Sequence, residues 1–244
     1  MSYLTSIAIF GDSIGRGSGD SHTSPAGQGD YLSGTSPTAP YINTGNYGWI
    51  ERSIANLFPY INFSVQGKTA AACTAALMPK ELAILDYAPP THAIIEVGVN
   101  DLMQNASADT LRTRLQALMT LLRGRYNGIE CYLTTVTPVS NSLDLWATTG
   151  NQFLSGTLPN GTTPYWAQFT DNTHTSGRSL HNYRVRNNLL GADGYIDSSG
   201  AVEDPTDERL WGTGSGARTA DGIHPNQAAH TTISLCYNPA TYFA

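Results

Sequence analysis

Short runs of apolar residues recur along the chain, separated by segments whose apolar residues are spaced for a helix. The first run covers residues 7–10, and further runs lie at about 60–66, 92–97, 129–136 and 195–197. Short apolar runs bounded by turn residues are typical of buried strands. We therefore predict five strands, joined by longer connections.

Helices are predicted in several of these connections. In the clearest one, Ser107 is the expected N-cap and Gly124 the expected end. Its apolar residues have helical spacing: Leu111, Leu115, Leu118, Met119 and Leu122. Further helices are predicted at 47–58, at 69–77, after Pro79, at about 177–190 and from Pro225 onward.

Strands that alternate with helices indicate a parallel sheet with helices on both faces. The chain shows no internal repeat and no linker, so we expect residues 1–244 to form one domain. Two segments, 15–46 and 138–176, lack any periodicity. Loops of this length are usually functional or disordered.

The composition restricts the partners that this protein could have. Hydrophobic residues make up 40% of the chain, charged residues only 13%, and the net charge is −6. Lys68 and Lys80 are the only lysines, which argues against binding to nucleic acid or to an anionic membrane. No apolar run is long enough to span a bilayer. A neutral polar partner suits this composition better.

The cysteines and the N-terminal residues indicate little about function. Cys73, Cys131 and Cys236 match no metal motif, and we interpret them as small core residues without a disulfide. The first residues lack the basic and apolar segments of a signal peptide. We expect any export signal to have been removed or to lie outside this chain, and the compartment stays open.

Polar residues follow each of the first three predicted strands. Gly11-Asp12-Ser13 follows the first, Gly67 the second and Gly98-Val99-Asn100-Asp101 the third, while Asp221 and His224 precede the final predicted helix. Loops after parallel strands open on one edge of the sheet, where ligands bind. We expect these groups to meet at that edge.

Their chemistry fits nucleophilic acyl transfer. A serine hydroxyl is a weak nucleophile until a base takes its proton, and His224 is the natural base for Ser13. Asp221 would orient that imidazole. The N–H groups of Ser13 and Gly67 and the side-chain amide of Asn100 would stabilise the oxyanion.

Other interpretations of these residues are open. Asn100 could cap the turn that follows it. Asp221 and His224 could be metal ligands, although no third ligand has matching spacing. Asp12 is expected to shape its turn rather than to take part in chemistry, and Lys68 to be a solvated residue at the start of a helix.

The four blocks resemble, in order, those of the SGNH (GDSL-type) hydrolase family. The resemblance spans essentially the whole chain. It implies an α/β fold with three α/β/α layers, in which a flavodoxin-like, doubly wound parallel sheet has five strands in the order 2-1-3-4-5. It also implies hydrolysis of carboxylic esters without a metal or other cofactor. Ser13, His224 and Asp221 match the family's triad, and Ser13, Gly67 and Asn100 its oxyanion hole.

Two departures from the family pattern touch no catalytic position. Lys68 follows the glycine of the second block, and Ala229 stands where a glycine is common after the His-Pro pair.

The two long loops are expected to set specificity, because both leave the carboxyl end of a strand. Candidate substrate contacts in and near them are Tyr31, Tyr41, Trp146, Trp166, His174 and Trp211. The aromatic rings would stack on sugars or hold acyl chains. Alternatively, they anchor the loops to the body of the protein.

We therefore predict a serine esterase for small acyl groups, and the composition of the loops favours acetylated carbohydrate over lipid as its substrate. One alternative is an acyltransferase or thioesterase on the same fold, and another is a non-catalytic carbohydrate-binding module.

Overall fold

The fold is built on a five-stranded parallel sheet that follows the predicted apolar runs. The computed structural model describes residues 5–19, 48–54, 57–214 and 216–243. The strands are β1 (Ile7–Gly11), β2 (Tyr60–Asn62), β3 (His92–Glu96), β4 (Glu130–Thr134) and β7 (Gly194–Ile196). Their order is β2-β1-β3-β4-β7, and all neighbours are parallel. This confirms the predicted order, with β7 as the fifth strand.

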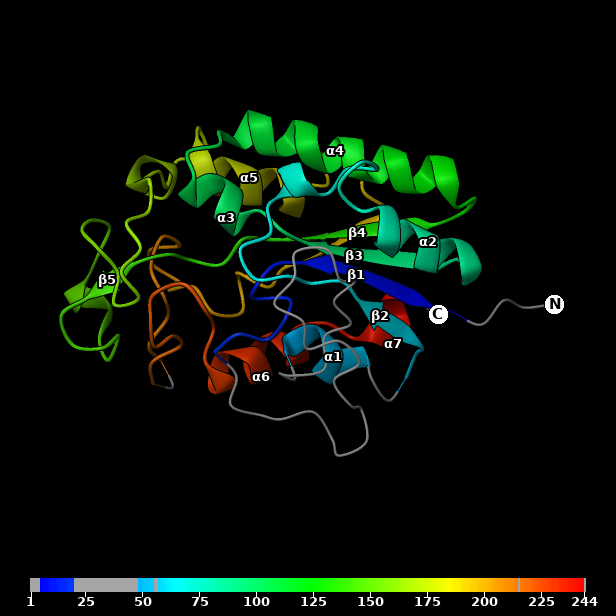
Figure 1. The fold of residues 1–244 in the computed structure, drawn as a ribbon. Coiled ribbons are helices and arrows are strands. Elements are labelled where there is room, and N and C mark those ends of the chain that lie inside the picture. Colours follow the sequence, from blue (N-terminus) through cyan, green and yellow to red (C-terminus); the bar gives the residue numbers. More distant parts are fainter. Residues whose placement is uncertain (1–4, 20–47, 55–56, 215, 244) are drawn as a thin grey trace.

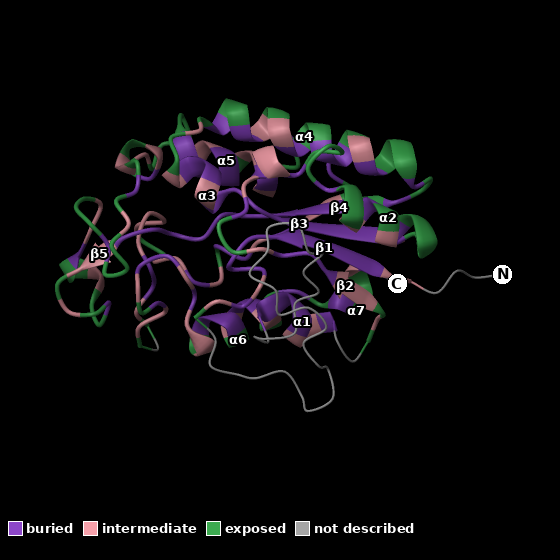
Figure 2. Cartoon of the chain, viewed as in Figure 1, coloured by how far each residue is buried: buried purple, intermediate pink, exposed green. Residues whose placement is uncertain are grey.

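Helices cover both faces of the sheet, as predicted (Figure 1). One layer contains α1 (Trp49–Ile54), α6 (Gln227–Leu235) and α7 (Pro239–Tyr242). The other contains α2 (Pro79–Tyr87), α3 (Val99–Met103), α4 (Ala108–Arg125) and α5 (Gly177–Arg186). In Figure 2 the strands β1 and β3 at the centre of the sheet are buried along their whole length, whereas the edge strands β2 and β7 are only partly buried.

Side-chain caps decide where two of the helices begin. Ser107 is the N-cap of α4, as predicted, because its hydroxyl accepts a hydrogen bond from the Thr110 N–H. The helix predicted to start at about Pro225 is α6, which starts two residues later, at Gln227. Asn226 is the N-cap of α6, because its side-chain oxygen accepts a hydrogen bond from the Ala229 N–H.

The predicted helix at 69–77 is also wrong. Only a 3-10 turn forms there, η1 (Ala70–Ala72). The Ala70 N–H donates to the carboxylate of Asp101, a long-range contact that the alanine-rich sequence does not reveal. The helix predicted at 177–190 ends at Arg186, and Asn188 takes a left-handed backbone with φ 51°.

The segment 138–176 contains more structure than predicted. It holds a small antiparallel pair, β5 (Asn141–Ser142) and β6 (Gln152–Phe153), and two 3-10 turns, η2 (Thr149–Asn151) and η3 (Trp166–Gln168). Most of the other predicted loop, with Tyr31 and Tyr41, lies outside the described residues. Cys73 and Cys131 are buried and free, as predicted, whereas Cys236 is free but exposed. In the described ranges, no helix has the length and apolar character needed to cross a membrane.

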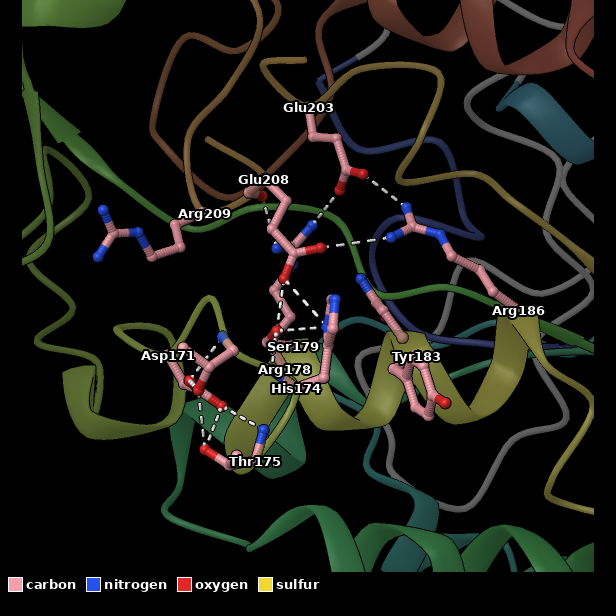
Figure 3. A network of polar contacts seen from close by, with 12 residues as sticks. Asp171, His174, Thr175, Arg178, Ser179, Tyr183, Arg186, Glu203, Glu208 and Arg209 are labelled. Atoms are coloured by element: carbon pink, nitrogen blue, oxygen red, sulfur yellow. Dashed lines mark hydrogen bonds and ion pairs between the residues drawn. The ribbon is translucent and has the colours of Figure 1, made fainter. Parts of the chain in front are cut away.

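A network of buried charges ties the segment after β7 to α5 (Figure 3). Arg178 is 2% exposed, and its guanidinium contacts the Val136 carbonyl at 2.8 Å, the Glu208 carbonyl at 2.6 Å and the Glu203 carboxylate at 2.7 Å. Arg186 bonds the other oxygen of Glu203 at 2.6 Å. We refer to these four residues, 178, 186, 203 and 208, as the Arg178 network.

Candidate active site

The structure brings Ser13, His224 and Asp221 into one hydrogen-bonded line. Ser13 lies in the turn directly after β1, at the carboxyl edge of the sheet. His224 Nε2 is 2.8 Å from Ser13 Oγ, and His224 Nδ1 is 2.6 Å from Asp221 Oδ2. The imidazole is thus oriented on one side by a carboxylate and faces the hydroxyl on the other, which is the geometry that nucleophile activation requires.

Asp221 also shapes its own loop. Its second oxygen, Oδ1, accepts the N–H groups of Ile223 at 2.9 Å and His224 at 2.8 Å. Burial by itself raises the pKa of Asp221, but the hydrogen bond and charge of His224 and these N–H groups outweigh it and hold the pKa below its usual value. The carboxylate therefore stays ionised beside the imidazole.

The loop that carries His224 is held by its neighbours. The Gly222 carbonyl accepts hydrogen bonds from Ser140 N–H at 3.2 Å and from Trp211 Nε1 at 3.1 Å. Gly222 has φ +84°, and a Cβ there would lie 2.1 Å from the Ser140 carbonyl oxygen. Only glycine fits this position without a shift of the backbone.

Asp12 shapes the turn of Ser13, in agreement with the expectation from the sequence. It is fully buried, and Oδ1 accepts the Ile14 N–H at 2.8 Å while Oδ2 accepts Nδ2 of Asn100 at 3.1 Å. Burial raises the pKa of Asp12 to about 7.

The sequence analysis missed a second buried carboxyl beneath this turn, that of Glu96. Its Oε2 accepts the N–H of Gly15 at 2.7 Å and that of Asp12 at 3.3 Å. Burial, and then the charge of Asp12, hold the pKa of Glu96 well above its usual value. An acidic residue at the end of an otherwise apolar strand was the only signal for it in the sequence.

The expected oxyanion donors lie at the same edge. Among the described residues, the N–H groups of Ser13 and Gly67 have no hydrogen-bond acceptor. Gly67 has φ +74°, and no atom lies within 4 Å of where its Cβ would be. Asn100 Nδ2 donates to Asp12 Oδ2 and to the Lys68 carbonyl, both at 3.1 Å. Its two hydrogens are thus engaged, and a bond to an oxyanion requires sharing or releasing one.

Lys68 is not the solvated residue that we expected. Its ammonium group is buried, donates to the Phe63 carbonyl at 3.3 Å and lies 3.9 Å from the Glu81 carboxylate. The cation is used to hold the segment around Gly67 in place.

A cavity of about 330 Å³ opens beside Ser13 and His224. The other residues that line it are Gln66, Gly67, Asn100, Met103, Gln104, Asn160, Thr162, Thr163 and Ile223. This volume is at the small end of the range for ligand pockets.

None of the candidate aromatic residues within the described ranges lines this cavity. Trp146 and Trp211 are fully buried, and their indole N–H groups donate to Ser140 Oγ and the Gly222 carbonyl. Their placement fits the anchoring alternative, because a ring that is buried and hydrogen-bonded through its N–H holds its loop against the body of the protein. Substrate contact by these two residues is therefore not supported.

Trp166 and His174 also lie elsewhere, and Tyr31 is outside the described residues. Trp166 is half-buried and donates to the Gly156 carbonyl. The ring of His174 stacks on Tyr183 with centroids 5.1 Å apart, and its Nδ1 is 3.0 Å from Ser179 Oγ. Figure 3 shows the side chains of His174 and Tyr183 next to the Arg178 network.

Comparison with known proteins agrees with the geometry. The model of the GDSL-like lipase/acylhydrolase family matches residues 7–236, and the chain belongs to this family. Members of the family hydrolyse carboxylic esters, so the protein is a carboxylic ester hydrolase. A comparison with curated proteins gives no match.

Solved structures share the fold at low sequence identity. A putative GDSL-like lipase from Parabacteroides merdae is 14% identical, with a TM-score of 0.57 over 100% of this chain and 98% of that chain. A carbohydrate acetylesterase from Sinorhizobium meliloti is 12% identical, with a TM-score of 0.56 over 98% of each chain. At such identities the likeness establishes the fold alone.

Proposed function

We propose that this protein is a serine esterase that cleaves small acyl groups from alcohols through a covalent acyl-enzyme. The observation that carries the proposal is the line from Asp221 through His224 to Ser13, with contacts of 2.6 and 2.8 Å. The line ends at a cavity in which two backbone N–H groups have no protein partner among the described residues.

In the first half of the reaction, His224 Nε2 takes the proton of Ser13 Oγ while Oγ bonds to the ester carbonyl carbon. The carbonyl oxygen becomes an oxyanion that accepts the N–H groups of Ser13 and Gly67 and an amide hydrogen released by Asn100. The imidazolium, stabilised by Asp221, then gives its proton to the leaving alkoxide. The products are a free alcohol and an acyl group on Ser13.

In the second half, His224 takes a proton from water, and the hydroxide oxygen bonds to the acyl carbon. Collapse of this second oxyanion breaks the bond to Ser13 Oγ, which recovers its proton from His224. The acyl group leaves as a carboxylic acid, and no cofactor takes part in either half.

The small cavity and its apolar residues Met103 and Ile223 favour a short acyl group such as acetyl. The low charge of the loops favours acetylated carbohydrate over lipid. An acyl series of p-nitrophenyl esters tests the first point, and activity is expected to fall from acetate to octanoate.

The mechanism is tested by hydrolysis of p-nitrophenyl acetate. We expect Ser13→Ala to lower kcat by about 10⁴-fold or more, since triad residues act as a unit. His224→Ala is expected to cause a loss of similar size. Undiminished activity of the Ser13→Ala variant would overturn the proposal, and transfer of the acyl group to added alcohols in preference to water would favour the acyltransferase.

A further inference from the structure

The residues that line the cavity around the candidate machinery are neutral and rich in hydrogen-bonding groups. Gln66, Gln104, Asn160, Thr162 and Thr163 present amides and hydroxyls. Among the residues that the structure describes, the cavity lining contains no Asp, Glu, Lys or Arg. An anionic or cationic substrate group would therefore lose water there without meeting an opposite charge, which is unfavourable.

One wall of the cavity is a rigid turn at 158–162. The Leu158 N–H bonds the Thr162 carbonyl at 2.8 Å, and the Gly161 N–H bonds the Leu158 carbonyl at 2.9 Å. Asn160 Oδ1 accepts the Thr162 N–H at 3.0 Å. The side chain of Asn160 is thus oriented through its oxygen, which leaves its NH₂ group as a donor.

This turn is anchored on both sides of the cavity. Leu158 is 2% exposed and packs next to Gly222, two residues before His224. On the other side, the Tyr165 N–H donates to the Met103 carbonyl of α3 at 3.1 Å. The wall is therefore preformed, which lowers the entropy cost of binding.

Two other residues of the lining offer free amides. Within the part of the chain that the structure describes, the side-chain amides of Gln66 and Gln104 have no hydrogen-bond partner. Most other asparagine and glutamine side chains of the described ranges do have one, for example Asn62, Gln152 and Asn182. Two unpaired amides and one oriented amide in the same lining suit a ligand with several hydroxyl groups.

We propose that this cavity binds the leaving alcohol as a neutral sugar, with Asn160 and Gln104 donating hydrogen bonds to its hydroxyl groups. The inference rests on the proposed esterase function and deepens it, because it names the substrate class and two specificity-determining residues. An acetylated uronic acid, a phosphorylated sugar or a thioester with a polyphosphate carrier would meet no Lys or Arg in the described part of the lining.

The experiment compares kcat/KM on three substrates: a mono-O-acetyl methyl glucoside, the corresponding acetylated methyl glucuronide, and p-nitrophenyl acetate. The two sugars differ only at C6, where the second has a carboxylate. We expect the wild-type protein to favour the neutral sugar by about tenfold or more. Equal rates on both sugars would overturn the inference.

Variants assign the effect to residues. For Asn160→Ala and Gln104→Ala, the ratio of kcat/KM on the acetyl glucoside to that on p-nitrophenyl acetate should fall about fivefold, the value of one neutral hydrogen bond. Asn160→Asp keeps the acceptor for the Thr162 N–H but loses the donor, so it should lower the ratio as well without loosening the turn. Asn172→Ala, an exposed residue of the same loop outside the cavity lining, is the matched control and should leave the ratio unchanged.

A gain of function makes the test stricter. Gln104→Lys adds a cation at the cavity and should raise the rate on the acetylated glucuronide relative to the glucoside. Hydrolysis of p-nitrophenyl acetate but of neither sugar would overturn this inference and leave the esterase function standing. Absence of hydrolysis of all three substrates would overturn both.

Discussion

Two buried polar clusters in this protein satisfy their charges in different ways. In the Arg178 network, the carboxylate of Glu203 lies between two guanidinium groups, and Arg178 also contacts backbone carbonyls. Beneath Ser13, the carboxyls of Asp12 and Glu96 lie close together and accept N–H groups, without an Arg or Lys partner among the described residues.

The difference appears in their protonation. Asp197 pairs with Arg186 at the edge of the network, and although burial raises its pKa, the arginine outweighs this and lowers the pKa overall. Asp12 has only neutral donors at hydrogen-bond distance, and burial raises its pKa to about 7. Opposite charge thus keeps the partly exposed carboxyl of Asp197 ionised, whereas neutral amide donors leave the fully buried carboxyl of Asp12 titrating near neutrality.

The largest effect is expected from Arg178→Met. It leaves Glu203 with one partner fewer and removes the donor that bonds the carbonyls of Thr137 and Glu208, which should lower the free energy of unfolding by about 3–5 kcal/mol. Urea unfolding followed by circular dichroism measures this. At urea concentrations below the unfolding transition, kcat of the variant should stay within about threefold of the wild-type value. A loss of activity without a loss of stability would contradict a structural role for Arg178.

Glu96→Ala should act mainly on catalysis. It removes the acceptor of the Gly15 N–H and one of the two acceptors of the Asp12 N–H, whose bond to the main-chain carbonyl of residue 96 remains, and so loosens the turn of Ser13. A misplacement of about 1 Å costs about 100-fold in rate, so we expect kcat on p-nitrophenyl acetate to fall by that factor with little change in KM.

Glu96→Gln is the control for this positioning role. Its side-chain oxygen can still accept the Gly15 N–H, so it should recover most of the activity. Equal losses in the two variants would show that the side chain acts in some way other than as an acceptor.

The pH dependence of stability should separate the two clusters. The native pKa of Asp12 is about 7, against an ordinary value of 3.8. The native state therefore holds a proton that the unfolded state has lost between about pH 4 and 7, and this contribution to stability disappears as the pH rises through that window. Asp197 has a lowered pKa, so its contribution is present above the ordinary value and lost as the pH falls.

We expect Asp12→Asn to reduce the fall in the free energy of unfolding between pH 5 and 7.5, measured by urea titration. Asp197→Asn should leave that slope unaltered. Glu51 and Glu96 also have raised pKa values, so part of the slope should persist. An unchanged slope in Asp12→Asn would contradict the assignment.

The smallest effect is expected from Arg209→Ala. Arg209 pairs with Asp207 at 2.6 Å, but its side chain is 29% exposed and points away from Arg178 in Figure 3. Partly exposed ion pairs contribute about 0–1 kcal/mol. The melting temperature should fall by only a few degrees. A loss of stability as large as that of Arg178→Met would show that Arg209 belongs to the Arg178 network.

Local patterns were sufficient for the elements with strong periodicity. The apolar runs of β1 and β3 and the N-cap of α4 depend on neighbouring residues, and all three were predicted correctly. Where a distant residue intervenes, as Asp101 does at Ala70, the local pattern gave the wrong element.

What the sequence by itself determined is the identity of the chemical groups and the edge of the sheet at which they meet. Ser13, Gly67, Asn100, Asp221 and His224 follow from the order of the blocks, because parallel strands place their carboxyl ends together. Only the tertiary structure decided the depth and the surroundings of each side chain. It buried Trp146 and Trp211, placed Glu96 beneath Ser13 and brought Asn160 to the cavity, because the path of a long loop depends on contacts that local sequence does not encode.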